Sequence, residues 1–294
     1  MMRARRMVRI RHLNCATMCP PFAAAFNTSG FLVAHVLLME TSSGLILVDT
    51  GLGTRDLEAP RQRLGMTFLL ASGPRLDVAE TALFQIERLG YTARDVRHIV
   101  LTHLDLDHAG GLSDFPHAEV HVMGVERQFA FGPLKWRHRT RYRMAQFAHR
   151  PRFVDYEGGG ERWFGFDAVR AMTGVDAEVL LVPLPGHTLG HAGVAVRDGE
   201  QWLLHAGDAY FHHDEILGGS ASIVLEGYQR AVAMDAGARL SNRERLVELS
   251  GRGTVKIFCA HDPLEWTRFD AESTARNADT RGEMSRLKNA VPDS

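Results

Sequence analysis

The chain has 294 residues, of which 45% are hydrophobic and 23% charged, with a formal net charge of -1. This composition predicts a folded globular protein, and the near-neutral charge argues against a dedicated nucleic-acid binder. Three cysteines are too few for a disulfide framework, the basic N-terminus lacks the apolar core of a secretory signal, and no run reaches the roughly 18 apolar residues of a membrane span. We therefore expect a cytoplasmic protein without nucleic-acid or membrane partners.

The first half of the chain is predicted to form short strands around one helix. Residues 55–76 contain prolines and glycines and are expected to form an irregular surface excursion. A helix is predicted over 77–89, with Asp77 as its cap and Gly90 as its end. Apolar runs predict strands at residues 31–39, 45–48, 96–103 and 118–124.

The stretch from residue 124 to 153 has a helical composition and carries many cations. These cations either face solvent along a helix or belong to a lid, over residues 125–165, above a site for a polar or anionic substrate. The cations concerned are Arg137, Arg139, Arg141, Arg143, Arg150 and Arg152.

The second half repeats the strand-rich pattern. Three strand-like runs lie between residues 177 and 211 and are broken by Pro-Gly, Asp-Gly and Gly-Asp. A helix is expected over 231–249, a last strand over 254–263, and a polar helix or tail over 268–294. Because strands and helices do not alternate strictly, the pattern favours two sheets covered by helices, in a single domain (residues 1–294) of two similar halves.

Titratable side chains gather where the predicted strands end. Four of them fall within six residues, and three more follow other apolar runs. They are His103, Asp105, Asp107 and His108, and then His187, Asp208 and His261. Clustered carboxylates and imidazoles need a cation to offset their desolvation and repulsion, and both suit zinc, iron or manganese. Seven ligands are too many for one tetrahedral ion, so the sequence predicts two divalent ions.

These motifs resemble those of the metallo-β-lactamase superfamily. Its HxHxDH motif is matched by residues 103–108, HLDLDH, and its later motifs by PGHTLGH, HAGDAY and FCAHDP. The resemblance implies an α+β fold, in which four layers form an αββα sandwich with the metals at one edge.

The resemblance also assigns roles to individual residues. It implies that His103 and His187 bind the first metal and that Asp208 bridges the two metals. The second metal would be bound by Asp107, His108 and His261. Asp49 and His191 would hold ligands in orientation.

Within the superfamily, the chain looks most like the lactonases and arylesterases, including enzymes that open N-acyl-homoserine lactones. The excursion after Asp49, the bulky segment before His187 and the helix before FCAHDP carry this likeness. It implies a hydrolase in which a metal-bridging hydroxide attacks the carbonyl of a small lactone or ester. Asp107 would orient the nucleophile. Tyr210 would donate to the oxyanion, although it follows Asp208 by two residues and the lactonase tyrosine by three.

Asp105 stands where the superfamily has its second histidine. If Asp105 is a ligand, the extra carboxylate makes the centre less positive and a weaker Lewis acid. Zinc is still the expected ion, but iron or manganese becomes competitive.

Other functions and assemblies are compatible with the same motifs. A glyoxalase-type thioesterase is one alternative. A diiron oxidoreductase is another, because flavodiiron proteins also carry a carboxylate at the position of Asp105. A homodimer is also compatible with the sequence.

Overall fold

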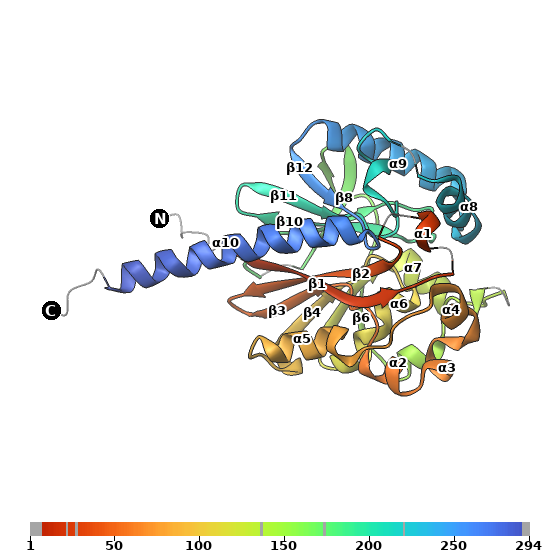
Figure 1. The fold of residues 1–294 in the computed structure, drawn as a ribbon, viewed down its shortest axis with the longest axis horizontal. Coiled ribbons are helices and arrows are strands. Elements are labelled where there is room, and N and C mark those ends of the chain that lie inside the picture. The colour runs from red at the N-terminus through yellow and green to blue at the C-terminus, as the bar shows by residue number, and fades with distance from the viewer. Residues whose placement is uncertain are drawn as a thin grey trace.

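The computed structural model describes residues 8–21, 23–26, 29–135, 138–172, 175–219 and 221–289, with side chains to residue 278. Two six-stranded sheets face each other, with helices outside them (Figure 1). The first sheet contains, in spatial order, β1 (Arg9–Met18), β2 (Leu32–Thr41), β3 (Gly44–Val48), β4 (Val96–Val100), β5 (Glu119–Met123) and β6 (Arg152–Tyr156). The second contains β12 (Val255–Phe258), β11 (Gln201–His205), β10 (Ala192–Asp198), β9 (Val179–Pro183), β8 (Phe166–Ala171) and β7 (Glu161–Trp163).

The direction of the strands brings several loops to one edge. Strands β3 to β6 are parallel, so the segments after β3 and β4 leave the first sheet at the same side. In the second sheet β11 and β12 are parallel, while β8 to β11 pair antiparallel. The carboxyl ends of β4, β9, β11 and β12 each lead into a segment that carries predicted ligands.

The strands are apolar on both faces, because each sheet is covered by the other sheet on one face and by helices on the other. In β2, Leu37 and Met39 pack between the two sheets, whereas Leu38 packs on the outer side of the first sheet, together with Ile86 of a covering helix. Leu246 packs in the same way on the outer side of the second sheet. A strand buried on both faces reads as a continuous apolar run. The resulting layers form the expected αββα sandwich.

The helices lie mainly on the outer faces and at the ligand-bearing edge. The α-helices are α1 (Ala23–Phe26), α2 (Thr54–Glu58), α3 (Pro60–Arg63), α4 (Gly65–Ser72), α5 (Ala82–Arg88), α6 (Leu106–Ala109), α7 (Gly124–Ala130), α8 (Ile223–Val232), α9 (Ala236–Gly251) and α10 (Pro263–Asn289). The 3₁₀ turns are η1 (Val78–Glu80), η2 (Ala93–Asp95), η3 (Gly110–Asp114), η5 (Met144–Phe147) and η6 (His213–Glu215).

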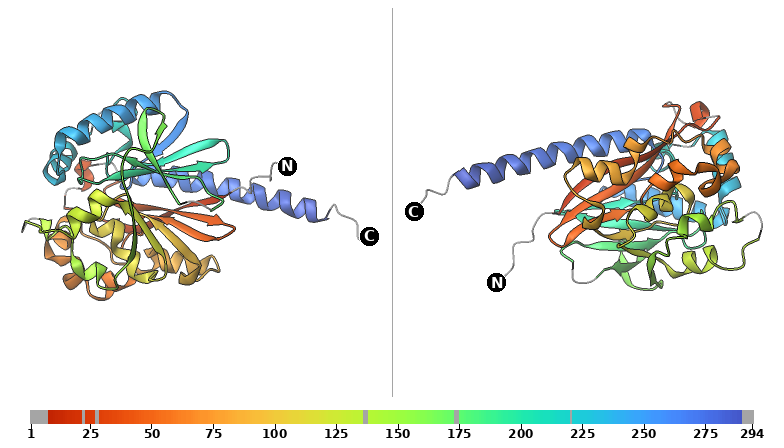
Figure 2. Two further views of the ribbon diagram at one scale, coloured as in Figure 1. Left: turned by 180° about the vertical axis from the view of Figure 1, so that it is seen from behind. Right: turned by 90° about the horizontal axis from the view of Figure 1, so that it is seen from below.

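Helix α10 packs along β1 and then runs beyond the sandwich (Figures 1 and 2). The Asn277 amide donates to the Ile10 carbonyl oxygen at 3.2 Å, and Phe269 packs between the sheets. The polar segment predicted from residue 268 is therefore helical as far as residue 289. Within the described part of the chain, no helix is both long and apolar enough to cross a membrane.

Several predicted elements differ from the observed ones. The excursion over 55–76 contains α2, α3 and α4. The helix predicted from residue 77 begins instead at Ala82, because Thr81 accepts a hydrogen bond from the Phe84 amide and Asp77 caps only the short η1 turn. The predicted helix at 231–249 is interrupted, since Asp235 caps α9 after α8 has ended.

The segment predicted as a lid is not one unit. Residues 152–156 form β6, which pairs with β5 as an edge strand of the first sheet. Among its described residues, those that line the cavity described below lie in its first half, between Phe129 and Arg141. Arg137 lies outside the described residues.

Candidate metal centre

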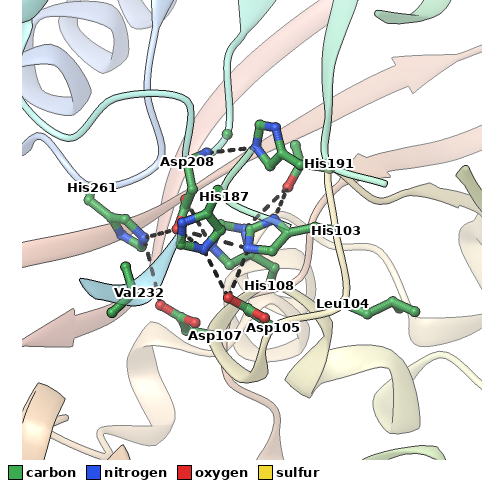
Figure 3. Close-up of polar contacts among 12 residues, drawn as sticks. His103, Leu104, Asp105, Asp107, His108, His187, His191, Asp208, Val232 and His261 are labelled. Carbon is green, nitrogen blue, oxygen red and sulfur yellow. Dashed lines mark hydrogen bonds and ion pairs between the residues drawn. The ribbon is translucent and has the colours of Figure 1, made fainter. Parts of the chain in front are cut away.

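The predicted ligands come together at the edge of the sandwich around Asp208 (Figure 3). The Oδ2 atom of Asp208 lies 3.2 Å from the Nε2 atom of His187 and 3.1 Å from that of His261. Its Oδ1 atom lies 3.2 Å from Nε2 of His108. His103 Nε2 is 3.8 Å from Oδ2. Asp208 therefore occupies the central position expected of a bridging ligand.

The remaining ligands fall into two groups on either side of Asp208. In each group, one ligand atom from each residue lies within 4.8 Å of the others. One group is His103, Asp105 and His187, and the other is Asp107, His108 and His261. These are the two ligand sets expected from the sequence, with Asp105 included in the first.

Unpartnered buried atoms support a cation between these groups. His103 Nε2, His108 Nε2 and Asp208 Oδ1 are buried and make no hydrogen bond in the described structure, and the last two atoms face each other at 3.2 Å. A buried polar atom without a partner is costly, and imidazole nitrogen with carboxylate oxygen is a donor set for zinc and similar divalent ions. The residues present therefore fit a divalent metal.

The ligands perturb one another strongly in the metal-free protein. Burial opposes ionisation of Asp208, but His261, His108 and His187 hold its pKa well below the usual value. Burial likewise opposes protonation of His108, yet Asp208 and Asp49 raise its pKa well above 6.5. His108 is therefore protonated in the metal-free protein, and a metal ion that binds its Nε2 atom has to displace a proton.

Asp49 fixes the orientation of His108, as predicted. Its Oδ2 atom lies 2.8 Å from His108 Nδ1 and accepts the Thr102 hydroxyl at 2.8 Å, while Oδ1 accepts the Thr102 amide at 2.8 Å. With Nδ1–H donated to Asp49, His108 Nε2 is the atom free for a metal. The backbone of Asp49 is in the left-handed region, at φ 59°.

His191 acts on a ligand through the backbone. Its Nδ1 atom donates to the Leu184 carbonyl oxygen at 2.9 Å, and its Nε2 atom accepts the amide of Asp208 at 2.9 Å. His191 therefore positions the loop that carries the central carboxylate, which agrees with the orienting role expected from the sequence.

Comparison with known proteins agrees with this geometry. The model of the metallo-beta-lactamase superfamily matches residues 29–261. The chain belongs to the metallo-β-lactamase superfamily.

Its relatives include proteins named as metallo-hydrolases and as lactonases. A probable metallo-hydrolase of Mycobacterium tuberculosis is 44% identical over 259 residues, which cover 87% of this chain and 81% of the relative. An N-acyl homoserine lactonase of Bacillus cereus is 26% identical, covering 76% and 79%. A solved N-acyl homoserine lactone hydrolase with its product at the metal centre superimposes with a TM-score of 0.65 at 21% identity, covering 90% and 97%. We therefore assign this chain as a metallo-hydrolase.

The prediction for Tyr210 is not supported by its position in this metallo-β-lactamase fold. Tyr210 is fully buried, and its hydroxyl donates to the Glu265 carboxylate at 3.0 and 3.2 Å. Tyr210 does not line the cavity beside the predicted ligands, whereas Tyr228 of α8 does. The pKa of Tyr228 is raised by burial and by the nearby carboxylates of Asp107 and Asp208. Sequence spacing carried no signal for Tyr228, because it lies 20 residues after Asp208.

A buried carboxylate that the sequence analysis missed connects three segments of the centre. Glu126 is fully buried in α7. It accepts the Leu104 amide at 3.0 Å, the Gly190 amide at 3.1 Å and the Tyr142 hydroxyl at 3.1 Å. Leu104 follows His103, and Gly190 lies between the predicted ligand His187 and His191, so Glu126 holds two ligand-bearing loops together. A Cβ on Gly190 would lie 2.2 Å from the Glu126 nitrogen, which explains the glycine.

Arg141 is the second residue whose role was missed. Its Nε and Nη2 atoms donate to the two carboxylate oxygens of Asp105 at 2.5 and 2.6 Å. Burial opposes ionisation of Asp105, but Arg141 and His103 hold its pKa well below the usual value. Asp105 is thus an ionised member of the first group. From the sequence, Arg141 was expected only as one of the cations of a solvated face or lid.

A cavity of about 820 Å³ opens onto the metal centre. The ligands at its base are Asp105, Asp107, His187, Asp208 and His261. Apolar side chains form much of the remaining wall, among them Met18, Leu32, Phe68 and Phe211. A concave, largely apolar site with a few convergent polar groups is typical of small-molecule binding.

Proposed function

We propose that this metallo-hydrolase opens lactones or cleaves small carboxylic esters, using two divalent ions, with zinc as the expected metal. The observation that carries the proposal is the cluster of seven potential metal ligands, five of which line an apolar-walled cavity of about 820 Å³. The lactonases among the relatives support this substrate class. An acyl chain suits the apolar wall, and the carbonyl would face the ligands.

The residues around the cavity supply complementary functions. Divalent ions held there would polarise a carbonyl group and lower the pKa of a water molecule. Asp107 lines the cavity and can orient a water molecule by accepting a hydrogen bond from it. The raised pKa of Tyr228 keeps its hydroxyl protonated, so it can donate a hydrogen bond to the oxygen on which charge develops. A leaving alkoxide suits this site, because it departs more readily than an amine.

Hydrolysis assays test the substrate class directly. The purified chain, depleted of metal and reloaded with zinc, manganese or iron, is given an N-acyl-homoserine lactone, a simple γ-lactone and an aryl ester. We expect metal-dependent release of acid from at least one of them. Failure with all three substrates under every metal would refute the proposal.

Paired tyrosine variants test the role of Tyr228. Tyr228→Phe should lower kcat by up to about 10²-fold with its metal content unchanged, since one oxyanion donor is lost. Tyr210→Phe, the matched control, should leave kcat nearly unchanged, because its hydroxyl bonds to Glu265. The opposite ranking would restore the role predicted for Tyr210.

A glyoxalase-type thioesterase is a second candidate. Lys135 and His138 line the same cavity and could meet an anionic substrate. Turnover of S-lactoylglutathione, without turnover of lactones or aryl esters, would favour this candidate.

A further inference from the structure

The substitution of the second motif histidine by Asp105 is accompanied by a specific cation. All three guanidinium nitrogens of Arg141 are engaged. Nε and Nη2 donate to the two oxygens of Asp105, and Nη1 donates to the Val232 carbonyl oxygen at 2.7 Å. A two-point contact between arginine and a carboxylate has a fixed geometry, and lysine cannot reproduce it.

The pair lies inside the ligand cluster. Asp105 Oδ2 is 3.0 Å from His187 Nε2 and 3.3 Å from His103 Nε2. Arg141 Nη2 itself approaches His187 Nε2 at 2.5 Å. The positive charge therefore borders on the first group of ligands and adds to the potential that a metal would experience there.

The segment that carries Arg141 is fixed to the same loops as the ligands. Its neighbour Tyr142 is buried, and the Tyr142 hydroxyl donates to Glu126. Glu126 also binds the loops that follow His103 and His187. One buried carboxylate thus sets the position of the arginine relative to the ligands.

The net charge of a two-metal centre would depend on both Asp105 and Arg141. Two divalent ions carry four positive charges, and Asp105, Asp107 and Asp208 offset three of them. With a neutral histidine in place of Asp105, only two would be offset. The guanidinium of Arg141 adds one charge back, so the centre has the same net charge as one with the superfamily's histidine.

We propose that Asp105 and Arg141 together replace the second histidine of the HxHxDH motif, and that Arg141 is a positioning and charge-compensating residue for the first metal. This inference rests on the proposed two-metal centre. It also revises the expectation that Asp105 alone shifts the centre towards iron or manganese, because Arg141 offsets the extra carboxylate.

Four variants test the pair through metal binding rather than turnover. Zinc affinity is measured by competition with a chromophoric chelator, and metal content by elemental analysis. Asp105→His restores the family residue but leaves the guanidinium facing the ions, so we expect the weaker of the two zinc affinities to fall by about 10- to 100-fold. The double variant Asp105→His/Arg141→Met should recover wild-type zinc affinity to within about threefold, a non-additive result.

Single changes at Arg141 complete the test. Arg141→Met should still bind two ions but should take up manganese more readily against zinc than the wild type does. Arg141→Lys keeps the charge, so it should retain the wild-type selectivity, although its affinity will be lower. Arg143→Met is the control from the same segment, because its guanidinium donates only to the Gln62 carbonyl oxygen among the described contacts.

Three results would overturn the inference. The first is an Asp105→His variant that binds two zinc ions as tightly as the wild type. The second is a double variant no better than Asp105→His alone, with thermal unfolding confirming that both are folded. The third is a wild-type chain that holds one ion at saturating zinc and gains a second in Arg141→Met, since the guanidinium would then occupy the first site. These readouts do not depend on lactone hydrolysis, so they remain decisive if the proposed substrate class is wrong.

Discussion

Two groups of buried histidines in this molecule have different electrostatic surroundings. In the candidate metal centre, carboxylates raise the pKa of His108 and His261 despite burial, whereas burial and Arg141 lower that of His187 to about 4. Between the sheets, His12 and His35 are as deeply buried, and burial together with neighbouring histidines lowers the pKa of both, that of His12 to about 3.

The contacts of the second group explain the difference. His12 Nδ1 and His35 Nε2 lie 2.7 Å apart, and the His205 ring donates to the His35 carbonyl oxygen at 2.6 Å. The rings pack against Phe258 and Phe269. The hydrogen bonds described for these rings join them to one another and to backbone groups. Burial of histidine is therefore not a signal for metal binding, whereas the convergence of histidines and carboxylates is.

The largest expected effect comes from removing the central carboxylate. Asp208→Ala removes a carboxylate that contacts predicted ligands of both groups. Loss of a partner that does not touch the metal costs up to about 100-fold in metal affinity, so we expect a larger fall here. Hydrolytic activity should be lost with it. Elemental analysis after dialysis measures the change.

The matched control is His12→Leu in the second group. This variant should keep its full metal content, because His12 lies outside the centre. If His12→Leu lost metal as Asp208→Ala does, the distinction between the two groups would fail.

A large effect on stability is expected at Glu126. Glu126→Ala leaves two backbone amides and the Tyr142 hydroxyl without their acceptor. Each unsatisfied buried donor costs about 1–3 kcal/mol, so the free energy of unfolding should fall by several kcal/mol. Urea denaturation measures it.

Glu119→Ala provides the comparison, since its bond to Arg152 is exposed and worth at most about 1 kcal/mol. Equal losses of stability in the two variants would show that Glu126 has no special role.

A smaller effect on metal binding is expected at Asp49. Asp49→Asn keeps the size of the side chain but removes the charge that holds the Nδ1 proton of His108. We expect metal affinity to fall by about 10- to 100-fold, with secondary structure unchanged by circular dichroism. Unchanged affinity would mean that Thr102 and burial alone orient His108.

The smallest expected effect distinguishes the groups by pH. The pKa of His12 is about 3 in the folded protein and near 6.5 when unfolded, so the unfolded chain binds the proton first. The contribution of His12 to stability is therefore complete above pH 6.5. It is lost as the pH falls towards 3, by about 1.4 kcal/mol for each pH unit.

Metal-free wild type and His12→Leu should therefore diverge under mild acid. From pH 7 to pH 5 the wild type should lose about 2 kcal/mol more than the variant. Urea denaturation at each pH gives the comparison. Parallel curves for the two proteins would show that His12 does not contribute to acid sensitivity.

The sequence was most informative where the chemistry is local. The run from His103 to His108 predicted ligands on its own, because so many titratable groups in six residues have no structural explanation. His187, Asp208 and His261 followed from their position after apolar runs. The order of these motifs then indicated the fold.

Residues that act across the fold could not be predicted from spacing. Arg141 and Glu126 act through partners 36 and 64 residues away, in Asp105 and Gly190. The surroundings of Tyr210 were not predictable either, because its buried hydroxyl donates to Glu265, 55 residues later in the chain. Nothing in the local sequence indicates where this side chain points.

Strand β1 shows a different kind of failure. No strand was predicted over these basic residues, which were considered only as a secretory signal, but Arg9 and Arg11 alternate with the buried residues Ile10 and His12 and both pair with Glu40 of β2. The alternation of charged and buried residues, with a period of two, was present in the sequence. That Glu40 would neutralise the two arginines was not visible there.

The scattering of the ligands over both sheets has a kinetic consequence. His103 and His261 are 158 residues apart in the sequence, and the centre is complete only when the ends of β4, β9, β11 and β12 have met. Contacts of such long range form late during folding, because the chain must first close large loops. The rate at which a refolding chain captures zinc, followed by a fluorescent indicator, would therefore time the docking of its two halves.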